Sequence, residues 1–269
     1  MNVTILGTGS RGNAIVVECD GDRVLVDAGF PARTLAQRLR ATGHPPESIS
    51  ALILTHAHGD HACGARVAAR RYGWTVYATP GTIHELPELA VTKPVPISPR
   101  ETLLLDTMVV SSVRIPHDCL EPVAVAIESR RTGARCGIAY DLGHAPASVE
   151  RALSQVDALV LESNHDEDML RNGPYPRSVQ RRISGGRGHL SNRAAARMAR
   201  NLAHHGLRHV VLAHVSAQNN TAAAAHGAVS AALHRTPFRG DLTVAGQDAA
   251  TSFTVERARR AEQMNLFGR

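Results

Sequence analysis

The chain has 269 residues, of which 43% are hydrophobic. A domain of this length buries roughly 70% of the surface of its unfolded chain, so a large core is expected. The excess of 30 Lys and Arg over 24 Asp and Glu gives a net charge of +6 and favours a phosphate-bearing partner, since arginine forks bind phosphates well.

We expect the chain to be neither a membrane protein, nor a secreted protein, nor a protein that binds single strands by stacking on their bases. No apolar run approaches the ~18 residues of a membrane span, and a strand-like run begins at Val3, which leaves no room for a signal peptide. The four cysteines form no C-x-x-C pair. One Trp, four Tyr and four Phe are too few for a platform that stacks on single-stranded bases. We therefore expect a cytoplasmic, nucleoid-associated protein.

Short apolar runs typical of buried strands recur along the chain. They lie at Val3–Leu6, Ala14–Val17, Val24–Val26, Ala51–Leu54, Val76–Ala78, Leu103–Leu105, Val109–Ile115, Val123–Ile127, Gly137–Tyr140, Ala158–Leu161, Val210–Ala213, Leu242–Val244 and Ser252–Val255. Helical patterns lie at Ala32–Arg40, Ala62–Arg71, Ala147–Leu153, Asn192–His204 and Ala222–His234. This alternation predicts an α/β protein with sheets covered by helices. Without a repeat or long linker, we expect one domain over residues 1–255 and a C-terminal tail over 256–269.

A dense group of metal-binding side chains follows the run Ala51–Leu54, in the sequence THAHGDH at residues 55–61. It places three imidazoles and one carboxylate within six positions, from His56 to His61, and Gly59 permits the turn that lets them converge. Neutral imidazoles and ionised carboxylates suit a borderline divalent metal ion. The motif therefore predicts a metal site at the end of this strand.

This motif resembles the metallo-β-lactamase fold family, whose hydrolases hold two metals at the strand ends of an αββα sandwich, two mixed β-sheets flanked by helices. The resemblance implies further ligands after later strands: His117 in IPHD, Asp141 in YDLG and His214 in AHVS. It implies a first metal ion held by His56, His58 and His117, a second held by Asp60, His61 and His214, and a bridge through Asp141. The cofactors implied are two divalent ions, Mn²⁺ or Zn²⁺.

Further motifs are similar to the YycJ/WalJ-like exonuclease branch of this family. They are LGTGSRGN at 6–13, VDAGF at 26–30, ATPGT at 78–82, LESNHD at 161–166, GHLSN at 188–192 and AHVSAQNN at 213–220. The resemblance implies a metal-dependent 5′-to-3′ exonuclease that acts on DNA in replication-linked repair. Loss of Asp60 is then expected to abolish turnover, and we count it as catalytic.

His189 is the second catalytic candidate. It precedes a predicted helix whose N-cap is Ser191, and such an N-terminus offers free N–H groups to an anion. We expect His189 to contact the scissile phosphate or protonate the leaving oxygen. Other candidate substrate contacts are Ser10, Asn13, Asn164, His165, Arg187, Ser191 and Asn192.

Two sets of polar residues keep a structural interpretation beside the functional one. Asn164 and Glu167 could instead form a capping box for a short helix that ends at Gly173. The histidines that do not follow a strand are expected to lie on the surface or to be structural. They are His84, His144, His204, His205, His209, His226 and His234. Of these, we expect His144 to lie nearest to the site.

The tail carries a second motif. QMNLF at 263–267 resembles the Q-x-x-L-F peptide that docks on the bacterial sliding clamp, where Leu266 and Phe267 would fill an apolar pocket and Gln263 would bond at its edge. The alternative is that the apolar side chains of the tail pack on the domain itself. For the whole chain, the alternatives are a small-molecule phosphodiesterase or lactonase on the same metal centre, and a clamp-associated adaptor without activity.

Overall fold

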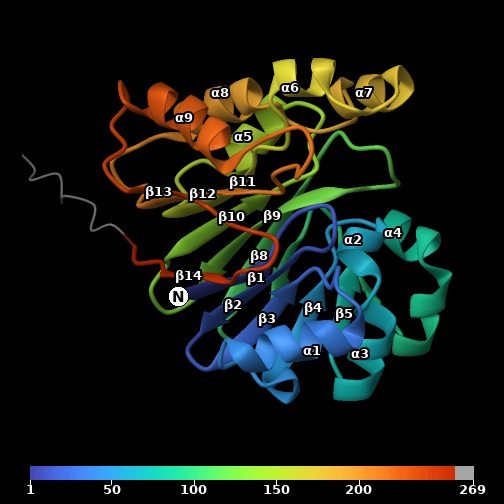
Figure 1. Cartoon of the computed structure of the whole chain (residues 1–269). Coiled ribbons are helices and arrows are strands. Elements are labelled where there is room, and N and C mark those ends of the chain that lie inside the picture. The colour runs from blue at the N-terminus through green and yellow to red at the C-terminus, as the bar shows by residue number, and fades with distance from the viewer. Residues whose placement is uncertain (258–269) are drawn as a thin grey trace, which may run out of the picture.

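The computed structural model describes residues 1–257 and shows, within them, two seven-stranded mixed sheets packed face to face (Figure 1). The first sheet has the order β14-β1-β2-β3-β4-β5-β6 and comprises β1 (Asn2–Gly7), β2 (Ala14–Cys19), β3 (Asp22–Val26), β4 (Ile49–Ile53), β5 (Thr75–Ala78), β6 (Val95–Pro96) and β14 (Thr251–Thr254). The second has the order β13-β12-β11-β10-β9-β8-β7 and comprises β7 (Thr102–Leu104), β8 (Met108–Arg114), β9 (Val123–Ser129), β10 (Arg135–Ala139), β11 (Ala158–Glu162), β12 (His209–Ala213) and β13 (Asp241–Val244).

Helices cover the outer face of each sheet, as Figure 1 shows. The first sheet is covered by helices drawn in blue and teal: α1 (Ala32–Ala41), α3 (Ala65–Tyr72) and α4 (Pro80–Glu85), with the short α2 (Gly59–Ala62) at its edge. The second is covered by α5 (Ala147–Ala152), α8 (Asn192–Leu202) and α9 (Ala222–Leu233), and α6 (Glu167–Asn172) and α7 (Arg177–Ser184) extend to one side of them. The expected αββα sandwich is confirmed.

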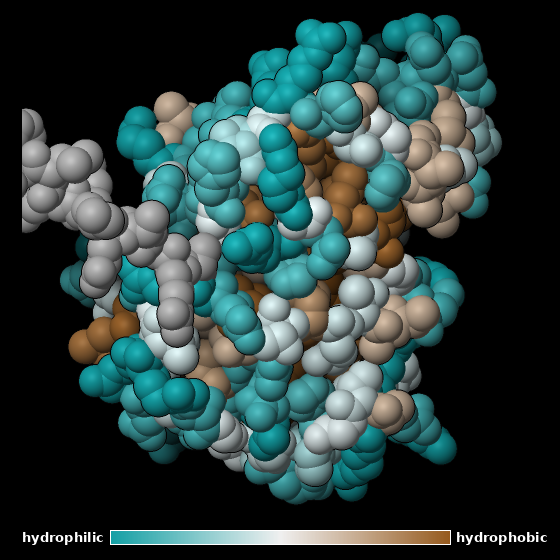
Figure 2. All heavy atoms as spheres, turned by 90° about the vertical axis from the view of Figure 1, so that its left-hand side faces the viewer, coloured by the Kyte–Doolittle hydropathy of each residue, from teal (hydrophilic) through white to brown (hydrophobic). Residues whose placement is uncertain are grey.

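The inner strands of both sheets bury side chains on both faces, as β2 and β12 show. In β2, Ile15 and Val17 lie in the core between the two sheets, while Val16 packs under α1 and α3. In β12, Val211 lies in the same central core and Leu212 packs under α8 and α9. Because neither face meets water, these strands are uninterrupted apolar runs rather than alternating ones. Figure 2 shows the β13 and β14 side, where hydrophobic groups are visible mainly in the middle, between hydrophilic groups above and below.

The parallel strands place the loops with the candidate metal-binding residues at one edge of the sandwich. β3, β4 and β5 run parallel in the first sheet, and β10 to β13 run parallel in the second. The carboxyl ends of parallel strands meet at the same edge of a sheet. The loops after β4, β10 and β12 therefore lie together, where each carries its expected ligand.

Three local expectations were wrong. The predicted helix over Ala62–Arg71 is divided into α2 and α3, because Gly64 donates its N–H to Ala28 O, and a Cβ on Gly64 would lie 2.2 Å from Phe30 O. The capping box was also misplaced, since α6 is capped by Asp166, which accepts from the N–H groups of Asp168 and Met169. Gly59 was expected to allow a turn, yet it starts α2 at an ordinary backbone angle.

Other features were missed or confirmed. The sequence did not predict α4, α7 or the two-residue β6. Ser191 caps α8 as predicted, accepting from Ala194 N–H.

Among the described residues, none of the helices has both the length and the apolar character needed to cross a bilayer.

Candidate metal centre

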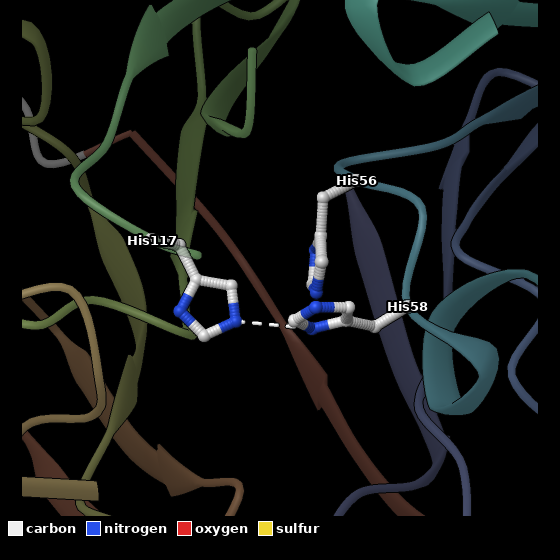
Figure 3. Close-up of side chains that lie close together, drawn as sticks. All are labelled: His56, His58 and His117. Carbon is white, nitrogen blue, oxygen red and sulfur yellow. Dashed lines mark hydrogen bonds between the residues drawn. The ribbon is translucent and has the colours of Figure 1, made fainter. Parts of the chain in front are cut away.

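Three imidazoles meet across the gap between the sheets. His56 and His58 come from the loop after β4, and His117 comes from the loop after β8 (Figure 3). His117 Nε2 lies 3.1 Å from His58 Nδ1, and one nitrogen from each of the three rings lies within 4.8 Å of the others. His56 and His58 follow a strand of the first sheet, whereas His117 follows a strand of the second. The three rings are therefore brought together only when the two sheets pack against each other.

A second group lies beside the first. Asp60 and His61 belong to α2, and His214 directly follows β12. His214 Nε2 lies 3.2 Å from Asp60 Oδ2, and His61 Nε2 lies 3.6 Å from the same oxygen. Their ligand atoms also lie within 4.8 Å of one another. Both groups therefore have the spacing of a metal site.

Asp141 lies between the two groups. Its Oδ2 is 3.5 Å from His56 Nε2 and 2.7 Å from His61 Nε2, while its Oδ1 is 3.4 Å from His214 Nδ1. Within residues 1–257, neither Asp141 oxygen has a hydrogen bond of acceptable geometry, and His56 Nε2 has none either, although all three atoms are buried. Buried polar atoms are normally bonded. Nitrogen and oxygen donors left unpaired around one point fit a binuclear divalent metal site.

The charges in this cluster are strongly coupled. Burial disfavours the ionised form of Asp141, but the neighbouring imidazoles of His214 and His61 hold its pKa well below the ordinary range. Burial likewise disfavours a charged His61, yet the carboxylates of Asp141 and Asp27 raise its pKa to about 10. A cation bound here would have to displace the proton of His61, because a metal-binding imidazole is neutral.

Two buried carboxylates that were not predicted from the sequence, Asp27 and Glu162, contact the imidazoles of the site. Asp27 Oδ2 lies 2.7 Å from His61 Nδ1, and it also accepts hydrogen bonds from the hydroxyls of Tyr140 and Thr55, at 2.6 and 2.7 Å. Such partners fix the orientation of a metal-binding imidazole. The available signal was position, because Asp27 directly follows β3 just as Asp141 follows β10.

Glu162 is the second of these carboxylates and ends β11. It is fully buried, its Oε2 accepts the N–H groups of Leu142 and Leu190, and its Oε1 lies 2.7 Å from His189 Nδ1. Glu162 thus connects the loop that carries Asp141 to the loop that carries His189.

The backbone is unusual at three strand ends. Asp27, Asp141 and His214 have φ angles of 60°, 58° and 52°, in the left-handed region that residues other than glycine seldom adopt. Each such conformation costs on the order of 1–3 kcal/mol and persists where the surroundings enforce it. All three residues are buried at the cluster, so the strain coincides with the site.

The expected substrate contacts fall into two sets. Ser10, Asn164 and His189 line a cavity of about 310 Å³ over the ligand cluster. His165 and Ser191 line the cavity next to it. Asn164 Nδ2 also donates to His214 O, at 3.0 Å, so it holds a ligand loop as well.

The remaining expected contacts bond to the protein itself. Asn13 is fully buried and donates to Asp60 O at 3.2 Å, with His61 Nε2 3.0 Å away. Arg187 donates from Nε to His117 O at 2.9 Å. The side chain of Asn192 is buried and bonded to Ser163 and Asn220. His144, expected near the site, bonds to Gly186 O in the loop before His189.

Comparison with known proteins gives the family. The chain is 30% identical over 242 residues to "Exodeoxyribonuclease YycJ" of Bacillus anthracis, an alignment that covers 88% of this chain and 91% of that protein. The chain belongs to the metallo-β-lactamase superfamily. The model of this superfamily also matches residues 7–120. "Exodeoxyribonuclease WalJ" of Streptococcus pneumoniae is 29% identical over 230 residues, which cover 83% of this chain and 84% of that one.

Two solved structures share the fold of this chain. The protein YhfI of Bacillus subtilis superposes with a TM-score of 0.73 at 17% identity and covers 94% of this chain, while 99% of YhfI is matched. Zn²⁺-bound PqqB of Methylobacterium extorquens gives 0.70 at 20% identity, covering 93% and 99%. The expected family and branch are confirmed: the chain is a metallo-β-lactamase-fold metallohydrolase related to the YycJ and WalJ exodeoxyribonucleases.

Proposed function

We propose that this metallohydrolase is a phosphodiesterase that removes nucleotides from the 5′ end of DNA with two bound metal ions. The observation that carries the proposal is the convergence of seven imidazole and carboxylate side chains, in which buried atoms of His56 and Asp141 lack hydrogen-bond partners among residues 1–257. Its relation to YycJ and WalJ, over most of each chain, supports DNA as the substrate.

The ligands divide between two ions in this proposal. His56, His58 and His117 would hold the first, Asp60, His61 and His214 the second, and Asp141 both. When bound, two such ions supply an activated water and neutralise charge on a phosphodiester. The nitrogen-rich set suits Zn²⁺ by affinity, and Mn²⁺ is the alternative that the exonuclease branch favours.

His189 is the proposed proton donor. Its side chain is 19% exposed and lines the cavity over the cluster, with Nδ1 2.7 Å from Glu162 Oε1 and 3.0 Å from Asp141 Oδ1. Burial disfavours its charged form, but Glu162 and Asp141 raise the pKa of His189 to about 9. A protonated imidazole at neutral pH can protonate the oxygen that leaves phosphorus.

Cationic groups beside the cavity suit a polyanion. Arg182 lines the cavity and is held by Asp118, with its Nε 2.7 Å from Asp118 Oδ2. Arg177 and Arg181 lie on the same helix, α7, which has no buried side chain. An exposed arginine-bearing helix at the rim of a hydrolase cavity favours binding through the phosphate backbone.

A role in replication-linked repair, with tethering to the sliding clamp, is proposed from the tail. Gln263, Leu266 and Phe267 lie outside the described residues, so this proposal rests on the sequence motif alone. The proposed division into a domain over 1–255 and a tail over 256–269 rests on the same motif and on β14 ending at Thr254.

The test is a time course on DNA labelled at either terminus, with Mn²⁺, Zn²⁺ or a chelator. Release of labelled mononucleotide from the 5′ label first, abolished by chelator, is the expected result. Asp60→Ala and His61→Ala should abolish release while keeping the native circular dichroism spectrum. The exposed His226→Ala is the control.

Parallel assays with RNA, cyclic nucleotides and a lactone separate the alternatives. Faster turnover of any of these than of DNA would refute the assignment of DNA as substrate. Absence of turnover on every substrate with both metals would leave the adaptor interpretation.

A further inference from the structure

A second cavity, of about 520 Å³, lies directly beside the one over the ligand cluster. It is formed by α6, α7 and the start of α8, and His189 lines both cavities. A ligand group in the second cavity would therefore lie next to a group attacked at the metal centre. None of the residues assigned as metal ligands lines the second cavity.

The walls of this cavity are cationic. Arg177 and Arg181 reach it from α7, and Arg197 reaches it from α8. None of these three arginines forms an ion pair with the residues that the structure describes. Glu167, the carboxylate in the wall, is already paired with Arg193 and accepts a hydrogen bond from the Ser191 hydroxyl at 2.9 Å. The cavity thus keeps uncompensated positive charge for an anion.

A buried imidazole with an unpaired nitrogen lies in the wall of the same cavity. His165 is 3% exposed and lines the cavity, and its Nδ1 is buried without a hydrogen-bond partner in residues 1–257. Buried polar atoms normally have partners. The eleven-residue helix α8 begins here with Ser191 as N-cap, which adds the positive end of a helix dipole.

We propose that this second cavity binds the phosphate at the 5′ terminus of the strand, one nucleotide before the phosphate that is attacked. The proposal rests on the proposed nuclease function. Arg177, Arg181 and Arg197 would supply forked donors to the phosphate oxygens, and His165 would bond to the same group or to its bound water. Holding the chain end here would make the enzyme release single nucleotides.

The first test measures binding without catalysis. Thymidine 5′-monophosphate is titrated into the protein in the presence of a chelator, so that binding cannot occur through a metal ion. We expect saturable binding to the wild type, weakened about 10-fold or more in Arg181→Gln and His165→Asn, consistent with the loss of a charge-assisted bond. Arg200→Gln, which removes an exposed arginine from the same helix α8 outside the cavity, is the matched control and should bind normally.

The second test compares substrates with and without a 5′ phosphate. We expect wild type and Arg200→Gln to prefer the 5′-phosphorylated oligonucleotide in kcat/KM, and Arg181→Gln to lose that preference. Equal losses on 5′-phosphorylated and 5′-hydroxyl strands would assign the cavity to an internal phosphate and overturn the proposal. So would normal monophosphate binding by both cavity variants.

The two proposals fail in different ways. A wild type that binds thymidine 5′-monophosphate through Arg181 but cuts no DNA would refute the nuclease function and leave a nucleotide-binding cavity. A wild type that cuts DNA from the 5′ end but binds no monophosphate without metal would refute the cavity alone. Thermal unfolding of each variant shows whether a loss reflects misfolding.

Discussion

His61 Nδ1 lies 2.7 Å from Asp27 Oδ2, and neither side chain is exposed to solvent. Asp27 also accepts the N–H and the hydroxyl of Thr55 and the hydroxyl of Tyr140. This arrangement holds the opposite nitrogen of His61 toward Asp141, at 2.7 Å. Asp27, a carboxylate outside the candidate ligand set, thus fixes the direction in which the candidate ligand His61 points.

Asp27→Asn should weaken metal binding while the fold is retained. The amide keeps the shape of the side chain but loses the charge that orients and polarises His61, and loss of such a partner typically costs about 10–100-fold in metal affinity. Competition with a coloured chelator measures the affinity. The exposed Asp106→Asn is the control for charge removal. Unchanged affinity in Asp27→Asn would show that His61 does not depend on this contact.

Gly29→Ala should destabilise the loop that carries the ligands. A Cβ at Gly29 would lie 1.7 Å from Asp60 O and 2.6 Å from Asn13 N, so the backbone must move. Overpacking of this kind costs about 1–3 kcal/mol. Gly59→Ala, in the same region with open space around it, should change the free energy of unfolding by less than about 0.5 kcal/mol. Urea unfolding measures both, and equal stabilities would contradict the close approach.

His44 should make the protein less stable in mild acid. It is buried near Thr4, and its Nδ1 has no hydrogen bond to the part of the chain that the structure describes. Burial lowers its pKa below the ordinary 6.5, although Glu18 opposes the shift and Arg23 adds to it. The unfolded chain then binds the proton at higher pH than the folded one. The contribution of this group to stability is therefore present above the unfolded pKa and is lost as pH falls.

Urea unfolding at several pH values tests this. Between about pH 7 and pH 5, His44→Gln should lose less stability than the wild type, whereas the exposed His205→Gln should follow the wild type. An identical pH profile for His44→Gln and wild type would show that His44 carries no such linkage.

Leu266→Ala with Phe267→Ala should abolish capture by a bacterial sliding clamp without changing hydrolysis of a short oligonucleotide. The apolar pair would otherwise fill the pocket on the clamp. Surface plasmon resonance on immobilised clamp gives the affinity, and Met264→Ala is the control within the motif. Equal capture of the double variant and the wild type would remove the tethering proposal.

The strands and the convergence of the candidate ligands could be predicted from the sequence because both leave local signals. Runs such as Val123–Ile127 are apolar on both faces, since β9 is buried between the other sheet and the helices. His214 follows such a run directly, and His117 follows one after a single proline. The end of a strand is therefore visible in the sequence before any tertiary contact is known.

The supporting residues Asp27 and Glu162 and the second cavity could not be predicted in this way. Asp27 and Glu162 act through residues 34 and 27 positions away, so no local pattern marks their partners. Helix α7 was missed because it is only eight residues long and offers just two apolar side chains, Val179 and Ile183, neither of which is fully buried. The second cavity depends on α7, and it could be recognised only once α6, α7 and α8 had been placed.

The most direct test of the central claim is a crystal structure of the protein soaked in Mn²⁺, with anomalous diffraction data. Two anomalous peaks are predicted, one among His56, His58 and His117 and one among Asp60, His61 and His214, with Asp141 between them. A single peak, or none at full soaking, would contradict a two-metal centre.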